Sequence, residues 1–182
     1  MNVAIIVLFN PDDDNKGYQS IISQCDYTVI IDNSCCENII ESDLRDRYVY
    51  IPLNKNLGIA EAQNRALTYI EKNINSEDDV YIFQFDQDSD IEPGYINRMV
   101  ESYQFLENSD VNIGILGSQP VNKKTNLNYP INYFSTSNKE HTTPEKYEYV
   151  DCVISSGCVA NKMIFDDVGH FDSGLFIDSV DH

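Results

Sequence analysis

Short apolar runs alternate with amphipathic segments along most of the chain. Residues 3–9 form a continuous apolar run that ends at Asn10-Pro11, a pattern typical of a strand buried on both faces of a parallel sheet. Comparable runs predict further strands at residues 27–31, 48–53, 80–85, 113–116 and 149–154.

The segments between these runs have the periodicity of helices. In residues 59–74, apolar side chains recur at positions 59, 62, 66, 67, 70 and 74, which is close to the 3.6-residue repeat of an amphipathic helix. Further helices are predicted over residues 16–25, after Pro93, and after Gly157 through Phe165 with a stop at Gly169. Strands that alternate with helices favour an α/β fold in which helices flank a largely parallel sheet.

Residues 119–148 break this pattern. The stretch is polar and rich in Asn, Thr and Lys, so we expect a long excursion from the sheet. No apolar stretch approaches the ~18 residues that a membrane-spanning helix needs. The sequence therefore predicts no transmembrane segment.

Length and charge narrow the classes of function. The chain has 182 residues, enough for one domain, and its 12 Lys and Arg against 30 Asp and Glu give a net charge of −18. Such a chain offers no basic stripe for nucleic acid and no polybasic patch for an anionic membrane. An anionic ligand therefore needs another source of positive charge, for which a divalent cation is the natural candidate.

Cysteine usage and the N-terminus indicate a cytoplasmic protein. The five cysteines are an odd number without a Cys-x-x-Cys spacing, which fits reduced thiols better than disulfides or a zinc site. The short apolar run near Met1 lacks a preceding basic region, so no signal peptide is predicted.

Polar residues follow three of the predicted strands: Asn10 the first, Asp32 the second, and Asp86 with Asp88 the fourth. In open α/β sheets, ligands bind outside the carboxyl ends of the strands. Two carboxylates at positions i and i+2 can share one Mg²⁺ or Mn²⁺, whose shell is completed by water and phosphate oxygens. The pattern predicts a nucleotide diphosphate held through a metal ion.

The Asp-x-Asp pair has other interpretations. An EF-hand loop beginning at Asp86 would need glycine and glutamate where the chain has Ile91 and Asn97, so that interpretation fails. A phosphatase with Asp86 as nucleophile stays open, as does a pair of aspartates that only solvates a turn. Neither GxGxxG nor GxxxxGK[ST] occurs, which argues against a dinucleotide-dependent dehydrogenase and a P-loop enzyme.

Five segments in order carry a resemblance to a known family: IIVLFNP (5–11), VIIDNS (29–34), NKNLGIAEAQNRAL (54–67), FQFDQDSDIEPGYI (83–96) and VISSGCVANKMIFDDVGHFDSGLFIDSVD (153–181). With these motifs the chain resembles the family 2 glycosyltransferases, specifically their bacterial rhamnosyltransferase-like branch. The resemblance implies a GT-A fold and an inverting transfer of a sugar from a nucleotide diphosphate donor.

The resemblance also assigns roles to residues. It implies nucleotide contacts from Phe9, Asn10, Pro11, Asp32, Asn56, Gly58, Asn64, Asp86 and Gln87. Within that set, Asp32 matches the aspartate that binds the pyrimidine base. It also implies that Asp86 and Asp88 bind the metal ion, Mn²⁺ or Mg²⁺. The loop around the donor sugar and acceptor would be formed by Ser155, Ser156 and Gly157. Asp178 and Asp181 match the catalytic segment, with Asp181 as the general base.

Taken without the family, several of these residues have simpler explanations. Asp32 and Asn10 could form turns after strands, and Asn64 could be a capping or packing residue. The Ser-Ser-Gly sequence at 155–157 could be only a turn. For Gly58, the physical expectation is that the N-terminus of the following helix binds an anion.

The family continues beyond the aspartate that Asp181 matches, with Glu-Trp, an arginine and further helices. We therefore expect residues 1–182 to be one GT-A domain that is incomplete at its C-terminus. Residues 1–118 would form its nucleotide-binding half and residues 119–182 its acceptor-side half. Donor binding should survive in this chain, while transfer should be slow or absent.

The expected reaction moves L-rhamnose from dTDP-L-rhamnose to a polysaccharide or a lipid-linked saccharide, and a UDP-sugar donor stays open. Such acceptors would place the protein in the cytoplasm, with possible peripheral association at the inner face of the membrane. Two alternatives remain: a nucleotide-sugar binding module without turnover, and the phosphatase that uses Asp86.

Overall fold

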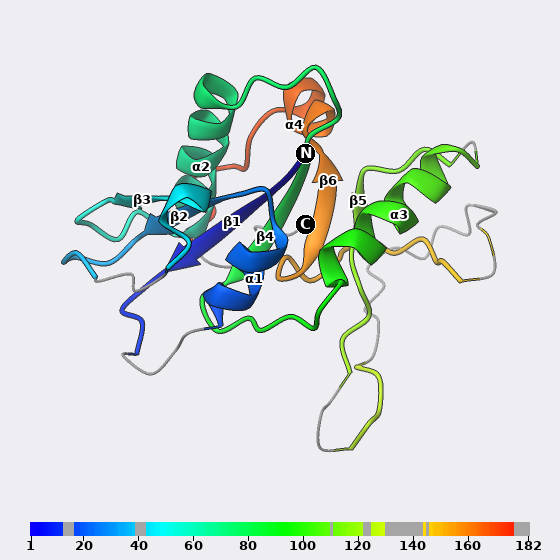
Figure 1. The fold of residues 1–182 in the computed structure, drawn as a ribbon, viewed down its shortest axis with the longest axis horizontal. Coiled ribbons are helices and arrows are strands. Elements are labelled where there is room, and N and C mark those ends of the chain that lie inside the picture. The colour runs from blue at the N-terminus through cyan, green and yellow to red at the C-terminus, as the bar shows by residue number, and fades with distance from the viewer. Residues whose placement is uncertain are drawn as a thin grey trace.

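The computed structural model describes residues 1–12, 17–38, 43–109, 111–121, 125–129, 144 and 146–176. Within these residues the chain forms one six-stranded sheet in the order β3-β2-β1-β4-β6-β5 (Figure 1). The strands are β1 (Asn2–Leu8), β2 (Tyr27–Asp32), β3 (Tyr48–Pro52), β4 (Tyr81–Asp86), β5 (Ile115–Leu116) and β6 (Cys158–Asn161). The helices are α1 (Tyr18–Gln24), α2 (Ile59–Asn73), α3 (Tyr95–Glu107) and α4 (Lys162–Val168), with a 3-10 turn at Arg45–Arg47.

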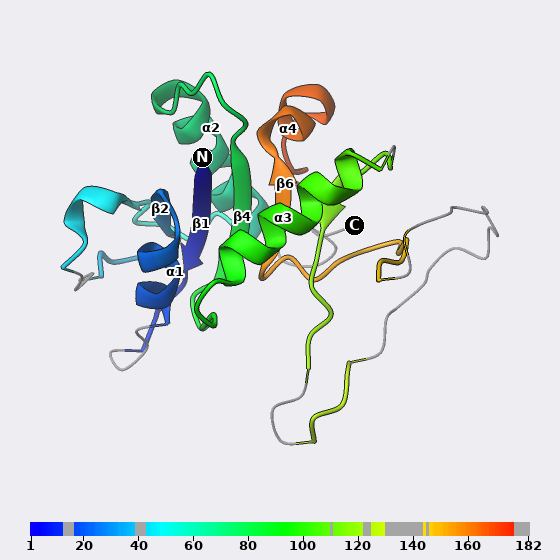
Figure 2. The ribbon, with the colours of Figure 1, turned by 45° about the vertical axis from the view of Figure 1, so that its right-hand side comes forward.

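The first four strands pair in parallel, as predicted, and β6 runs antiparallel to both β4 and β5. Alternate residues of the central strand face opposite layers. Ala4 and Ile6 of β1 pack with α1 and α3, whereas Val3 and Ile5 pack with α2 and α4. Figure 2 shows α1 and α3 in front of the sheet and α2 and α4 behind it. Because both faces are covered, the central strands read as largely apolar runs.

One strand prediction is wrong. Residues 149–154 have no regular structure. The strand is formed by the following residues of β6, for which the sequence pattern had predicted the start of a helix. The strand has only four residues, and its pairing with β4 and β5 depends on residues distant in sequence. Strand β5 is also short: it has two residues, within the predicted range 113–116, and it pairs with β6. Such short segments carry too little periodicity to reveal their type locally.

The helices predicted over residues 16–25, over residues 59–74 and after Pro93 are present as α1, α2 and α3. The helix predicted up to Gly169 is present as α4, and the Gly169 amide donates to the Phe165 carbonyl at 3.0 Å. Most of the polar stretch 119–148 lies outside the described residues. In all of the residues that the structure describes, no helix is both long and apolar enough to span a membrane.

Candidate functional site

The strand order brings the predicted polar positions to one edge of the sheet. Strand order reverses between β1 and β4, because β2 and β3 lie on one side of β1 and β4 lies on the other. In the register of these parallel strands, Leu8 is level with Asp32 and Val7 is level with Asp86. The carboxyl ends of three strands therefore meet at the switch point, where α/β sheets bind ligands.

Asp32 organises the loop that follows β2. Its side chain is 1% exposed, and Oδ1 accepts a hydrogen bond from the Ser34 amide at 3.0 Å. Oδ2 accepts from Asn38 Nδ2 at 2.7 Å and from the Tyr50 hydroxyl at 2.5 Å. A nucleotide base that approached this carboxylate would compete with these donors, since a carboxylate has about four lone-pair sites.

The hydrogen bonds also decide the charge of this carboxylate. Burial alone would raise its pKa, but the hydrogen bonds from Ser34, Tyr50 and Asn38 outweigh burial and hold the pKa of Asp32 below its ordinary value of 3.8. Burial and the hydrogen bond to Asp32 raise the pKa of Tyr50 to about 12. At neutral pH, a charged acceptor therefore faces a protonated donor.

We expect Asp32→Asn to lower the free energy of unfolding by about 2 kcal/mol at pH 7, because donors would lose a charged acceptor. A carboxyl group with a depressed folded-state pKa stabilises the fold above its unfolded-state pKa, and this contribution is lost as pH falls through the folded-state pKa. The difference from the unchanged chain should therefore shrink between pH 7 and pH 3. Urea unfolding at both pH values measures it, with the exposed Asp46→Asn as control; a difference independent of pH would contradict the assignment.

The segment after β2 is tied to the start of α2 by a pair of asparagines. Asn33 Nδ2 donates to Asn56 Oδ1 at 3.0 Å, and Asn33 Oδ1 accepts from the Leu57 amide at 2.8 Å. Asn56 Oδ1 also accepts from the Gly58 amide at 3.0 Å. Asn56 thus joins two loops, and Asn33, which the sequence analysis did not single out, is its partner. Asn33 directly follows Asp32 at the end of β2, and this position in the sequence could have identified it as a candidate site residue.

The start of α2 differs from the expected anion site. The first amide of the helix, at Ile59, donates to the Phe176 carbonyl at 2.8 Å. The chain's own carbonyl therefore takes the place that the sequence predicted for an anion. Asn64, further along the helix, uses both its amide oxygen and its amide nitrogen on the backbone of Phe171. Both polar atoms of the Asn64 side chain thus bind the backbone of Phe171, and the nucleotide contact that the resemblance implies for Asn64 stays a prediction.

The end of β1 contacts both neighbouring strand ends. The Phe9 amide donates to Gln87 Oε1 at 2.7 Å, and the Asn10 amide donates to Ser34 Oγ at 2.8 Å. Asn10 has a φ of +43°, which asparagine tolerates better than most residues. The Phe9 side chain is 45% exposed, so its ring has a face open to a ligand, and Pro11 beside it is half-buried.

The Ser-Ser-Gly turn lies against the end of β4. The Asp86 amide donates to Ser156 Oγ at 3.3 Å, and Ser156 Oγ is 2.5 Å from Ser89 Oγ. The Gly157 amide donates to the Gln84 carbonyl at 2.7 Å. Segments 70 residues apart thus lie against each other at this end of the sheet. The loop around the donor sugar and acceptor that the resemblance implies for residues 155–157 stays a prediction.

Tyr95, at the start of α3, holds this turn in place and was not predicted. Its hydroxyl donates to the Gly157 carbonyl at 2.7 Å and is 2.9 Å from Ser118 Oγ. Ser118 lines a cavity of about 510 Å³ at the β5 edge of the sheet, which residues 146–150 and 152–154 also border. The hydroxyl therefore links the Ser-Ser-Gly turn to the edge of this cavity.

Gly157 leaves no room for a side chain. Its φ is +89°, and a Cβ there would lie 2.8 Å from the Tyr95 hydroxyl oxygen. We expect Gly157→Ala to lower the free energy of unfolding by about 1–3 kcal/mol, the usual cost of such backbone strain. Gly114→Ala is the matched control, since a Cβ at Gly114 meets nothing within 4 Å. Equal unfolding midpoints of the two variants in urea would show that the turn tolerates a side chain.

The carboxylates at the β4 end have the composition of a partial metal site. Asp86 is half-buried and Asp88 is exposed. In the part of the chain that the structure describes, no group of three or more His, Cys, Asp or Glu side chains is arranged to hold a metal ion. Two carboxylates still suit Mg²⁺ or Mn²⁺, which commonly take one or two protein carboxylates together with water and substrate phosphates. Asp178 and Asp181, the predicted catalytic pair, lie outside the described residues.

Comparisons with known proteins agree with this architecture. The family model of glycosyl transferase family 2 matches residues 15–169. The dTDP-rhamnosyl transferase RfbF of Shigella flexneri is 32% identical over 189 aligned residues, which cover 98% of this chain and 60% of that protein. The chain therefore spans about 60% of the length of this curated relative. The crystal structure of S. aureus TarS 1–349 superposes with a TM-score of 0.52 at 13% identity, over 99% of this chain and 52% of that one.

Proposed function

Because the chain belongs to glycosyl transferase family 2 and has the α/β GT-A fold, we propose that it transfers a sugar from a nucleotide diphosphate donor to a saccharide acceptor. The donor is dTDP-L-rhamnose, by analogy with the similar dTDP-rhamnosyl transferase of Shigella flexneri. The acceptor is a polysaccharide or a lipid-linked saccharide. This proposal replaces the phosphatase alternative, in which Asp86 would be a nucleophile.

One observation carries the proposal. The Ser-Ser-Gly turn lies on the Asp86 end of β4, next to the carboxyl ends of β1 and β2. An exposed aromatic ring (Phe9), a buried aspartate (Asp32) and two strand-end carboxylates are thus neighbours on one edge of the sheet. A base, a diphosphate and a sugar need these kinds of partners in this order.

We assign the roles accordingly. The Phe9 ring stacks on the base, and the Asp32 loop accepts hydrogen bonds from it. Asp86 and Asp88 hold the Mn²⁺ or Mg²⁺ ion, which as a Lewis acid neutralises charge on the departing diphosphate. Ser156 lines the sugar, and Asp181 removes the proton of the acceptor hydroxyl as general base.

These roles suit the charge of the chain. Transfer develops positive charge on an oxocarbenium-like sugar and additional negative charge on the departing diphosphate. The chain has few basic residues, so acidic side chains that bind a cation can do what Arg and Lys do in basic sites. The Asp32 carboxylate is ionised at neutral pH, because its pKa is lowered, and it would accept the N3–H of thymine or uracil in competition with its present donors.

The proposed function is tested by following dTDP release from dTDP-L-rhamnose, with Mn²⁺ and octyl α-L-rhamnoside as acceptor probe, on the full-length gene product. Release that requires both the metal ion and the glycoside, with a rhamnosylated glycoside as product, is the expected result. Phosphate release from dTDP without any transfer would favour a phosphatase instead.

A further inference from the structure

A short segment after α4 lies along the whole length of α2. This segment, residues 169–176, is called the strap here. It leaves α4 beside the C-terminal part of α2 and ends at the N-terminus of that helix (Figure 1). Its direction is opposite to that of the helix, as its contacts show in order: His170 with Glu71, Phe171 with Asn64, and Phe176 with Ile59.

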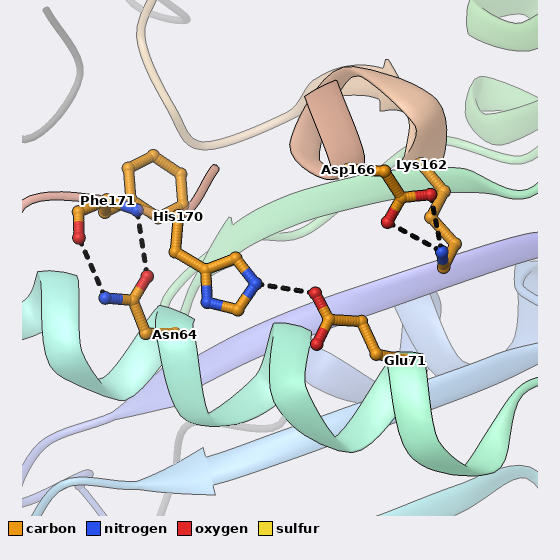
Figure 3. A network of polar contacts seen from close by, with 6 residues as sticks. All are labelled: Asn64, Glu71, Lys162, Asp166, His170 and Phe171. Atoms are coloured by element: carbon orange, nitrogen blue, oxygen red, sulfur yellow. Dashed lines mark hydrogen bonds and ion pairs between the residues drawn. The ribbon is translucent and has the colours of Figure 1, made fainter. Parts of the chain in front are cut away.

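The middle contact is the most specific. Asn64 Nδ2 donates to the Phe171 carbonyl at 2.9 Å, and the Phe171 amide donates to Asn64 Oδ1 at 2.9 Å (Figure 3). One side chain thus satisfies both backbone groups of a residue 107 positions away, as a neighbouring strand would. Asparagine is a poor residue for the interior of a helix, so its presence here calls for a reason outside the helix.

Packing supports the same position. The Phe171 ring lies 5.9 Å from that of Phe165, which is buried in the core between α2, α4 and the sheet. The backbone of the strap is therefore held from one side by Asn64 while its aromatic side chain is anchored in the core. This combination sets both the place and the orientation of the strap.

The contacts at the two ends of the strap differ: the one at His170 is weak, and the one at Phe176 is a close backbone approach. His170 Nε2 lies 2.7 Å from Glu71 Oε1 in a half-exposed pair, a kind of contact that contributes little by itself. At the other end the Phe176 carbonyl approaches so closely that a Cβ on Gly58 would lie 2.6 Å from it. Gly58 has a φ of +85°, and only glycine suits both conditions. These contacts extend over about 18 Å of helix.

The strap ends where the chemistry is expected. The start of α2 is joined through Asn56 and Asn33 to the carboxyl end of β2, so Phe176 lies beside the strand-end site. Asp178 and Asp181 follow Phe176 by two and five residues. Five residues of chain span at most about 18 Å, so the connection from the strap to the segment with the proposed general base is short.

We propose that Asn64 is a positioning residue: it holds the strap against α2 and thereby sets where the segment with the general base meets the donor. It does so through Phe171 and does not contact the nucleotide. This inference rests on the proposed function for its catalytic part, whereas the contact between Asn64 and the strap stands independently.

Three variants test the inference. Asn64→Ala removes both hydrogen bonds, and Asn64→Asp keeps the acceptor for the Phe171 amide but loses the donor to its carbonyl. Asn73→Ala is the matched control on the same helix, because the Asn73 side chain bonds only the local Tyr69 carbonyl in the described structure. Hydrogen exchange of residues 169–176, dTDP affinity by calorimetry, and kcat with dTDP-L-rhamnose and octyl α-L-rhamnoside are measured for each full-length variant.

We expect strap amides to exchange at least about tenfold faster in Asn64→Ala, with kcat reduced about tenfold or more and dTDP affinity within about threefold. Asn64→Asp should lie between Asn64→Ala and the unchanged chain, and Asn73→Ala should match the latter. A loss of dTDP affinity equal to the loss of kcat would overturn the inference in favour of a nucleotide contact. Unchanged exchange of the strap would overturn it outright. If hydrogen exchange of the strap changes in the variants as expected, but the protein without substitutions transfers no sugar, the proposed function and the catalytic role of the strap are refuted. The contact between Asn64 and the strap would still stand.

Discussion

Replacing Asp181 with asparagine is expected to reduce kcat of the full-length gene product by at least about 100-fold, the usual contribution of a general base. Affinity for dTDP should stay within about threefold, because the base acts on the acceptor hydroxyl and not on the nucleotide. Transfer is measured as dTDP release that depends on octyl α-L-rhamnoside, and affinity by calorimetry.

Asp167→Asn is the control for this experiment, since Asp167 is exposed on α4 and has no assigned role. Asp178→Asn is compared as well, because both aspartates belong to the segment that resembles the family's catalytic motif. Robust acceptor-dependent turnover by Asp181→Asn would assign the general base to another residue. A loss confined to dTDP affinity would place Asp181 in the nucleotide site.

The second large effect is expected at the end of β4. Asp86→Asn and Asp88→Asn should each weaken Mn²⁺-dependent binding of dTDP by about 10- to 100-fold, because each would remove one charged ligand of the proposed metal ion. Binding measured in EDTA should change little in either variant. Calorimetry of dTDP with Mn²⁺ and with EDTA gives both values.

Asp90→Asn is the matched control for that pair. Asp90 is exposed in the same loop, two positions beyond Asp88, so it reports the general effect of removing one negative charge from this edge. Unchanged affinity and unchanged metal dependence in Asp88→Asn would remove it from the metal site. An equal effect of all three substitutions would point to non-specific electrostatics.

The central sheet was predictable because its strands are buried on both faces. β1, β2 and β4 each read as a largely apolar run followed by a polar residue, so their existence followed from the pattern. The same pattern predicts a site at their carboxyl ends. The amphipathic repeat of α2 was equally clear. In each of these cases one local signal, apolar periodicity, agrees with the tertiary arrangement.

The short strand β6 was not predictable in this way. Its four residues gain their conformation from pairing with β4 and β5, and a local pattern cannot show such pairing. Gly157 and Asn161 flank it, and these residue types are as common in turns and helix caps as at strand ends.

Side-chain roles were harder to predict than the positions of the residues. Asn64 lies in a motif of the family resemblance, yet its amide is bound to Phe171, a residue 107 positions away. Tyr95 and Asn33 each hold a loop of the site through hydrogen bonds that only the folded chain creates. A sequence motif identifies which residues matter at a site more readily than what each one touches.

The most direct test of the account is calorimetric titration of the 182-residue chain with dTDP, UDP and GDP, each with Mn²⁺ and with EDTA. We expect saturable binding of dTDP or UDP with Mn²⁺, at least about tenfold weaker binding in EDTA, and at least about tenfold weaker binding of GDP. Equal binding of all three nucleotides without the metal ion, or no binding of any of them with it, would contradict a metal-dependent pyrimidine nucleotide site at the ends of β1, β2 and β4.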